Sequence, residues 1–380
     1  MIATLSIILV KFLGMLYVIP FYATVGVLGS ALYAYAYNIY IIFLDISSAG
    51  LPTAISKIIN EYNTLDKMDA KMRAYNIGKK IITLVSVAVF IILFVFAKPI
   101  ATLIIGDITG GNTIEDVAFV IRCVSFAILV VPYMSVTKGF LQGHKIINVS
   151  SISQIIEQVI RISIILIGSY LGVKVFHLSM RNTIGIAVFS AFVAGLCAIS
   201  YIFVVMRKHK EELGFTKEYK KDNVTNKEII KKIFAYAIPF IIIDIAVSIY
   251  NFIDMVLIMH TLNYLNLDAT TIEFSATAIS TWSAKIGMIV NSVAMGMSVS
   301  LIPTIVSAYT LKKWNEVNDK LNQALQLILI SSVPMVVGIS LLSKPIWSIF
   351  YGHNINGAII LSWHIFTSLF FNIYVVTSST

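Results

Sequence analysis

The chain has 380 residues, of which 58% are hydrophobic and only 12% are charged, with a formal net charge of +9. Soluble domains usually contain about 25% charged residues, so this composition excludes an ordinary soluble protein and indicates a polytopic membrane protein. The two cysteines, Cys123 and Cys197, both lie in apolar runs. They predict neither a disulfide framework nor a metal site, and we interpret them as small packing residues.

Apolar runs of about 20 residues, separated by charges or by Gly/Pro clusters, predict ten membrane-spanning helices. In chain order the predicted helices cover residues 2–25, 30–56, 77–105, 116–141, 147–172, 182–206, 232–260, 275–306, 321–350 and 357–380. The fold class is therefore an all-α polytopic membrane protein. The last run reaches Thr380 without a polar flank, and we expect the chain to be a fragment that is cut within its second half.

Lysine and arginine are distributed unevenly between the two sides of the membrane that these helices define. Of the 28 basic residues, 20 lie in or beside the loops that follow the second, fourth, sixth and eighth helices. The opposite loops hold only Lys98, Lys174, Arg181 and Lys344. Because cytoplasmic loops are enriched in lysine and arginine, the pattern predicts that the even-numbered loops and the N-terminus are cytoplasmic. The basic excess is thus an orientation signal, and we expect no nucleic-acid partner.

The longest polar stretch begins RKHKEELGFTKEYKK and predicts a basic cytoplasmic linker over residues 207–231. The linker divides an N-terminal six-helix lobe, residues 1–206, from a C-terminal lobe, residues 232–380. Only four helices are predicted in the second lobe, so we expect that lobe to be incomplete.

The two halves contain similar segments in the same order. AKPIATLIIG at 97–106 matches SKPIWSIFYG at 343–352 with an offset of 246 residues, and LPTAISKIINEYN at 51–63 matches IPTIVSAYTLKKWN at 302–315. Corresponding helices are six spans apart, so both halves have the same orientation in the membrane. This pattern predicts a parallel repeat with a cavity between two pseudo-symmetric lobes.

Several charged residues lie inside the predicted helices, where each would cost about 2.5–3.5 kcal/mol if it faced lipid. We therefore expect them to face an aqueous cavity or each other. The basic residues of this group are Lys11, Arg122, Arg161 and Lys285, and the acidic residues are Asp45, Glu157, Asp244 and Asp254.

The helix predicted at 147–172 carries a polar stripe. Its members, Gln154, Glu157, Gln158 and Arg161, are spaced i, i+3, i+4 and i+7, so they share one helix face. Two interpretations stay open. Glu157 and Arg161 form a structural ion pair, or Arg161 contacts an anionic group that Glu157 helps to position. We expect the stripe to face the cavity between the lobes.

Lys11 and Lys285 are stronger candidates for binding an anion, because neither has an acidic residue three or four positions away. Asp254, Asp244 and Asp45 are candidates for a coupling cation. Arg122 lies near a helix end, where snorkelling to the interface explains it. The tyrosines of ALYAYAYNIY, residues 31–40, are interpreted as packing or interfacial residues.

A two-lobed carrier with basic residues in its cavity is suited to an amphiphilic anion, because cations in a low-dielectric cleft compensate a phosphate strongly. The chain contains no GxxxxGK[ST] motif, so no ATP hydrolysis is expected from it. The energy would come from a Na⁺ or H⁺ gradient, from the membrane potential or from the substrate gradient. No cofactor or metal ion is expected.

Five segments carry a family resemblance. They are KFLGMLYVIPFY, ISSAGLPTAISKIINEYN, VIRCVSFAILVVPYMSVTKGFLQGH, SISQIIEQVIRI and SLIPTIVSAY. These segments resemble the polysaccharide-transport branch of the multidrug/oligosaccharidyl-lipid/polysaccharide (MOP) flippase superfamily, and in particular the MurJ-type lipid II flippases and the related stage V sporulation proteins B. The resemblance covers essentially the whole chain.

The resemblance implies a multi-pass flippase of the bacterial cell membrane with two six-helix, MATE-like lobes that alternate access to a cationic cavity. The implied substrate is the undecaprenyl-diphosphate-linked peptidoglycan precursor, lipid II, and the implied partners are this lipid-linked glycan and membrane lipids. We expect a monomer. Lys11 matches a cavity residue of the family, whereas Tyr17 replaces a second arginine of some relatives. Asp254 matches an acidic residue that binds sodium in some members.

Three other functions are weighed against this one. Export of a different lipid-linked oligosaccharide or polysaccharide needs the same fold and a similar cavity. A drug/cation antiporter should favour acidic and aromatic cavities, which the basic residues oppose. A membrane glycosyltransferase needs paired carboxylates, and the loop GDITGGNTIED has no DxD motif. We therefore expect a transporter rather than an enzyme.

Overall fold

The protein is described here from a computed structural model. The model describes residues 2–48, 50–144, 146–215, 219, 222–292 and 313–379. The predicted eighth helix, 275–306, therefore lies only partly within the described residues, and most of the segment IPTIVSAYTLKKWN lies outside them.

The N-terminal part of the chain consists of α1 (Ile2–Leu16), α2 (Val18–Ser48) and α3 (Leu51–Thr64). The predicted boundaries 2–25 and 30–56 differ from these, because the chain bends at two points. The helix breaks for one residue at Tyr17, and α2 kinks at Gly26, whose φ of 67° and ψ of −166° are not helical. A glycine tolerates this left-handed φ without the Cβ clash that other residues incur.

Residues 68–208 form long helices joined by short turns. α6 starts at a capping box in which the Thr113 hydroxyl accepts the Asp116 N–H at 3.2 Å, and the Asp116 carboxylate accepts the Thr113 N–H at 3.1 Å. The elements are α4 (Met68–Val95), α5 (Ala97–Ile105), α6 (Ile114–Gly143), α7 (Ile147–Tyr170), the π-helical turn η1 (Leu171–Val175) and α8 (Met180–Lys208).

The second half begins with the longest described helix, α9 (Asn226–Asn263), which starts six residues before the predicted boundary at 232. The cause is local: the Thr225 hydroxyl caps the helix by accepting the N–H of Glu228 at 3.3 Å. The following elements are α10 (Ala269–Thr277), the π-helical turn η2 (Ala278–Trp282), a helical segment 283–292, α12 (Trp314–Leu341), α13 (Ser343–Tyr351), α14 (Ile355–His364) and α15 (Thr367–Ser379).

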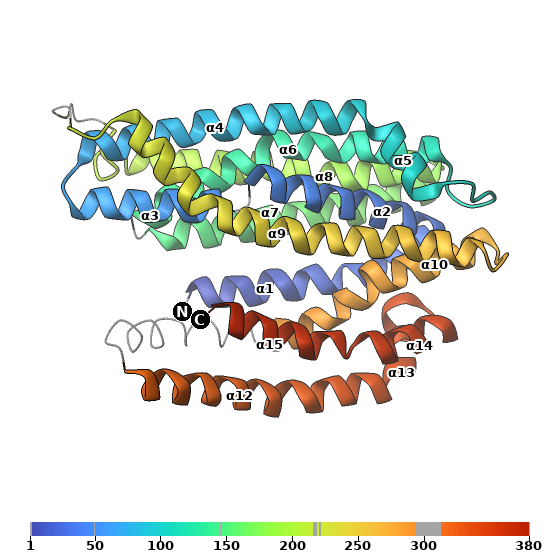
Figure 1. The fold of residues 1–380 in the computed structure, drawn as a ribbon. Helices are drawn as coiled ribbons and strands as arrows, with labels where there is room; N and C mark the ends of the chain where they lie inside the picture. Colours follow the sequence, from blue (N-terminus) through green and yellow to red (C-terminus); the bar gives the residue numbers. More distant parts are fainter. Residues whose placement is uncertain are drawn as a thin grey trace.

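The helices are arranged in two layers that run roughly parallel (Figure 1). α2 to α8 form the upper bundle, α9 crosses it and packs on α2 and α3, and α12 to α15 form the lower group. α1 lies between them and packs mainly on α7. We call the end with α3 and the 207–231 linker the linker end, and the opposite end, with α5 and α13, the far end.

Eight helical stretches within the described residues are long and apolar enough to cross a membrane. The first, Leu9–Thr64, contains two of the predicted spans, and the predicted span 275–306 is only partly described. The all-α membrane architecture is confirmed, while the count of ten spans stays a prediction.

The internal repeat is visible in the helix boundaries. Both ends of α4 and of α5 lie 246 residues before the corresponding ends of α12 and of α13. Gly106 and Gly352, which terminate α5 and α13, both have positive φ, 58° and 81°. Because two helices and their terminating glycine recur at one spacing, the sequence similarity between 97–106 and 343–352 reflects a repeated structural unit.

The two halves are tied together at both ends of the molecule. At the linker end, Lys232 on α9 forms an ion pair of 2.5 Å with Glu61 on α3, and both side chains are more than a third exposed. At the far end, the carboxylate of Glu273 on α10 accepts the backbone N–H of Asn112 at 2.6 Å, and both residues are buried.

Candidate functional site

Four tyrosines gather where the two halves meet. The hydroxyl groups of Tyr17 and Tyr33 are 3.3 Å apart, and the rings of Tyr33 and Tyr37 stack with centroids 6.1 Å apart and an interplanar angle of 12°. Tyr40 continues the same face of α2 and lines a small cavity together with Tyr33 and Tyr37. We call Tyr17, Tyr33, Tyr37 and Tyr40 the tyrosine cluster.

Lys285 reaches this cluster from the other half of the chain. Its Nζ lies 4.8 Å from the ring centroid of Tyr37 and 5.5 Å from that of Tyr17, and the residue is 8% exposed. The faces of aromatic rings carry partial negative charge, so they stabilise a desolvated ammonium group. The cation is thus held at the seam between the halves.

Arg161 contacts the opposite side of the cluster, from α7. It lines a cavity of about 20 Å³ with Tyr33, Tyr37 and Tyr40. The guanidinium forms an ion pair with Glu157, whose other carboxylate oxygen lies 3.4 Å from Nζ of Lys138 on α6. The Nε of Arg161 is buried and makes no hydrogen bond within the described part of the chain.

The residues of the polar stripe on α7 do not all face the same part of the molecule. Glu157 and Arg161 turn into the N-terminal lobe, and Gln158 lies against α1, with its Nε2 about 3.1 Å from where a Cβ on Gly14 would be. Gln154 is exposed. The four residues share one face of α7, but they meet different neighbours along it.

Lys11 lies on α1, and Tyr17 directly follows the last residue of that helix. Lys11 lines a cavity of about 80 Å³ together with Met288 and Ser292 of the helical segment 283–292, which also carries Lys285. The structure therefore brings Lys11, Lys285 and, across the tyrosine cluster, Arg161 to one region between α1, α2, α7 and 283–292.

The three acidic candidates are not among the described residues that line the two small cavities of this region. The Asp45 carboxylate accepts a hydrogen bond from the Ser248 hydroxyl, Asp244 is exposed, and Asp254 is half-buried on α9. Within the described residues, no group of three or more His, Cys, Asp or Glu side chains is arranged to hold a metal ion. A role of Asp45, Asp244 and Asp254 in cation coupling stays a prediction. The guanidinium carbon of Arg122 lies 5.8 Å from the ring centroid of Phe94.

Two further participants are not among the predicted site residues. Lys138 lies inside α6, and Glu273 lies in α10, two residues before the helix predicted at 275–306. Asn38 on α2 donates hydrogen bonds to Thr281 Oγ1 at 3.1 Å and to Met255 Sδ at 3.2 Å, joining the two halves beside the tyrosine cluster.

Among the described residues, this region holds four basic side chains, Lys285, Lys11, Arg161 and Lys138, and the carboxylate of Glu157, which pairs with the last two. An excess of positive charge with aromatic surroundings favours an anionic ligand that also has apolar parts.

Residues 1–309 match the model of the family described as polysaccharide biosynthesis protein. The chain belongs to this family. It is 34% identical, over 386 aligned residues that cover 99% of the chain and 70% of the relative, to the lipid II flippase MurJ of Bacillus subtilis. It is 21% identical to the stage V sporulation protein B of the same organism, covering 86% of the chain and 61% of that protein.

Solved structures share the fold. A multidrug resistance MATE family transporter of the MOP superfamily, in an inward-facing conformation, aligns with a TM-score of 0.68 and 13% identity over 97% of this chain and 82% of its own. The lipid II flippase MurJ in an inward closed conformation aligns with a TM-score of 0.67 and 17% identity over 99% of this chain and 74% of its own. The fold expected from the family resemblance is therefore confirmed.

Proposed function

We propose that this protein is a flippase that moves an undecaprenyl-diphosphate-linked peptidoglycan precursor, lipid II, from the inner to the outer leaflet of a bacterial cell membrane. The observation that carries the proposal is the 34% identity to a lipid II flippase along 99% of the chain. The chain covers 70% of that relative, and it matches transporters rather than enzymes.

The geometry supports an anionic, amphiphilic substrate. Lys285 and Arg161 flank the tyrosine cluster from two halves of the chain, so a diphosphate between them would be bound by both lobes. Charge-assisted hydrogen bonds to phosphate oxygens are roughly twice as strong as neutral ones. Lys11, Glu157, Gln154 and Gln158 are proposed to complete the walls of the binding region.

Alternating access would come from rocking of the lobes 1–206 and 232–380 about the linker 207–231. With the linker end in the cytoplasm, as the lysine and arginine distribution predicts, loading would occur there and release at the far end. Na⁺ or H⁺ binding at Asp254, Asp244 or Asp45, or the membrane potential, would drive the cycle. The protein would act as a monomer without a cofactor.

The test is complementation. The natural gene product that contains this sequence would be expressed in Bacillus cells depleted of their own lipid II flippase. Outer-leaflet lipid II would be measured by its cleavage with an externally added lipid II-degrading enzyme. Lys11→Ala, Arg161→Ala and Lys285→Ala would be compared with wild type at equal membrane levels, with the exposed Lys344→Ala as the matched control.

Restored flipping that the three cavity variants lose and Lys344→Ala keeps would support the proposal. If the well-expressed wild type does not restore outer-leaflet lipid II, the lipid II assignment is wrong. In that case export of another lipid-linked glycan becomes the leading function, and it would be tested with the corresponding lipid-linked sugars in the same assay.

A further inference from the structure

A second basic cavity lies away from the lobe interface, on the outer face of the N-terminal lobe. It has a volume of about 650 Å³ and lies between α4 and α6. Lys79, Lys80 and Asn76 line one part of it, and Leu84, Val87 and Tyr133 line the other. Within the described part of the chain, none of its lining residues is acidic.

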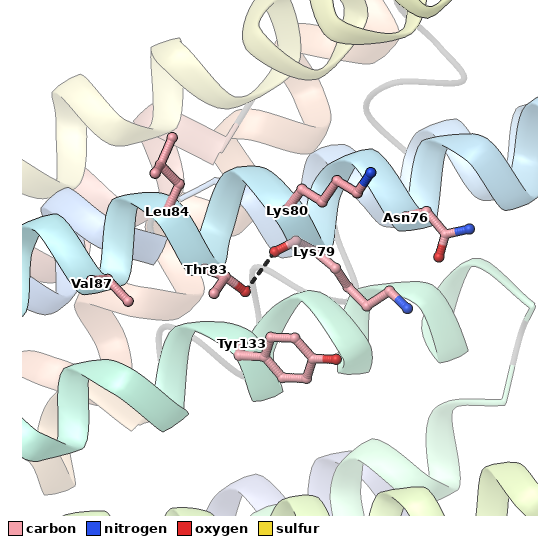
Figure 2. Close-up of a pocket in the computed structure, with 7 residues that line it drawn as sticks. All are labelled: Asn76, Lys79, Lys80, Thr83, Leu84, Val87 and Tyr133. Atoms are coloured by element: carbon pink, nitrogen blue, oxygen red, sulfur yellow. Dashed lines mark hydrogen bonds between the residues drawn. The ribbon is translucent and has the colours of Figure 1, made fainter.

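The cavity is divided into a polar and an apolar part along one helix stripe. Figure 2 shows the polar ends of Asn76, Lys79 and Tyr133 at the side toward the start of α4, whereas Val87 lies on the opposite side. Leu84 is 74% exposed and Val87 is 41% exposed. In a membrane-spanning helix, exposed apolar side chains such as Leu84 and Val87 face the acyl chains of lipids. The cavity is therefore basic at one end and apolar at the other.

The depth of the lysines fits a lipid headgroup. Arg73, near the start of α4, donates a hydrogen bond to the carbonyl of Val224 in the linker at 2.8 Å, which places this level of α4 at the linker end. Lys79 lies six residues further on, about 9 Å along the helix axis. Leu84 and Val87 follow deeper in the apolar layer. Lysine side chains at such a level extend toward the interface with their stems on apolar surface.

Lys79 is held in place by its surroundings. Its Nζ lies 4.3 Å from the ring centroid of Tyr75, and the residue is half-buried, while Lys80 is exposed. One cation is therefore positioned and the other is free to reach the same anion from solvent. A pair of lysines above an apolar groove is complementary to a single phosphate that carries two acyl chains.

We propose that this cavity binds one anionic glycerophospholipid of the linker-end leaflet, with its phosphate on Lys79 and Lys80 and an acyl chain along Leu84 and Val87. The site lies outside the lobe interface and is independent of the transported substrate. The lipid bridges α4 and α6, so its occupancy stabilises the N-terminal lobe.

The test uses the purified full-length protein in a non-ionic detergent, with bound lipid counted by native mass spectrometry. Phosphatidylglycerol, phosphatidylcholine and glycerol 3-phosphate are titrated separately. We expect saturable binding of phosphatidylglycerol that weakens about thirtyfold in Lys79→Ala/Lys80→Ala, as follows for two lysines at a bilayer surface. Lys79→Arg/Lys80→Arg keeps the charge and should retain binding.

The control is Arg207→Ala/Lys208→Ala, which removes two exposed positive charges from the same end of the same lobe. It should bind phosphatidylglycerol within twofold of wild type. Equal binding of phosphatidylcholine, or undiminished binding by the correctly folded Lys79→Ala/Lys80→Ala variant, would overturn the proposal. Equally tight binding of glycerol 3-phosphate would show a free-phosphate site and overturn the assignment to a lipid.

Discussion

The carboxylate of Glu273 accepts the backbone N–H of Asn112 at 2.6 Å, and the Asn112 side chain donates both to the same carboxylate and, at 3.0 Å, to the carbonyl of Leu28. Three separate parts of the chain, α10, the α5–α6 loop and α2, therefore meet in one buried polar group. Tyr35, also buried, lies close to the same carboxylate. Because the carboxylate is buried, these hydrogen bonds hold α10 to the α5–α6 loop and α2 only while the donors stay in place.

Glu273→Ala should loosen the far end, because it leaves the buried donors of Asn112 without an acceptor, at a cost of about 1–3 kcal/mol. Thermal unfolding in detergent would show the loss of stability. In a background without Cys123 and Cys197, a Leu28→Cys reporter should react faster with a soluble maleimide. The comparison is Lys232→Ala, which removes an exposed ion pair at the other end and should cost less than about 1 kcal/mol. Equal losses of stability in the two variants would contradict the idea that the buried contacts of Glu273 hold the far end more strongly than the exposed ion pair holds the linker end.

Lys285→Ala should reduce lipid II flipping about 10- to 150-fold, the equivalent of the 1.5–3 kcal/mol of a hydrogen bond to a charged group. Lys285→Arg should retain most activity, because a guanidinium also stacks on tyrosine. Tyr37→Phe preserves the ring face and should stay close to wild type, whereas Tyr37→Leu removes it. The readout is outer-leaflet lipid II in flippase-depleted cells. A Tyr37→Leu variant with normal flipping would show that the ring does not position Lys285.

Glu157→Gln should destabilise the protein by up to about 3–5 kcal/mol, since it leaves Lys138 and Arg161 as neighbouring, partly buried cations without a counter-charge. Adding Lys138→Met should restore much of the stability by removing one of them. Thermal unfolding measures both variants, and flipping assays on the rescued double variant separate structure from function. A stable double variant that does not flip would assign Glu157 a role in transport. Normal flipping would assign the ion pair to structure.

Gly106→Ala should cost more stability than Gly352→Ala, although the two glycines occupy equivalent positions of the repeat. Both substitutions force a non-glycine residue to a positive φ, at about 1–3 kcal/mol. At Gly106 a Cβ would also lie 2.6 Å from Cε1 of His260, whereas nothing lies within 4 Å at Gly352. His260 is held by a 3.0 Å contact between its Nε2 and the carbonyl of Leu103. Midpoints of thermal unfolding for the two purified variants would give the order directly, and the reverse order would refute the argument.

Much of the architecture could be predicted from the sequence, because its determinants are local. Hydropathy over about 20 residues identifies a helix that crosses a membrane, whatever its neighbours are. The repeat could be detected because two short motifs recur with their prolines, one of them with its terminating glycine at an offset of 246 residues. In the structure, α12 and α13 begin and end at that offset from α4 and α5. Lys11, Arg161 and Lys285 stood out because charges are costly in a membrane.

Contacts between helices could not be read in the same way. Residues 31–40 looked like packing tyrosines, and only the tertiary structure brings Lys285 to the face of Tyr37 from the other half of the chain. The same holds for Lys138 beside Glu157, and for Glu273 beneath Asn112. The periodicity of a helix defines which residues share a face, but the rotation and packing of each helix determine what that face meets. The sequence therefore identified several of the charges that lie inside the helices of this protein, whereas the tertiary structure decided which of them are partners and added Lys138 and Glu273, whose neighbours no local pattern shows.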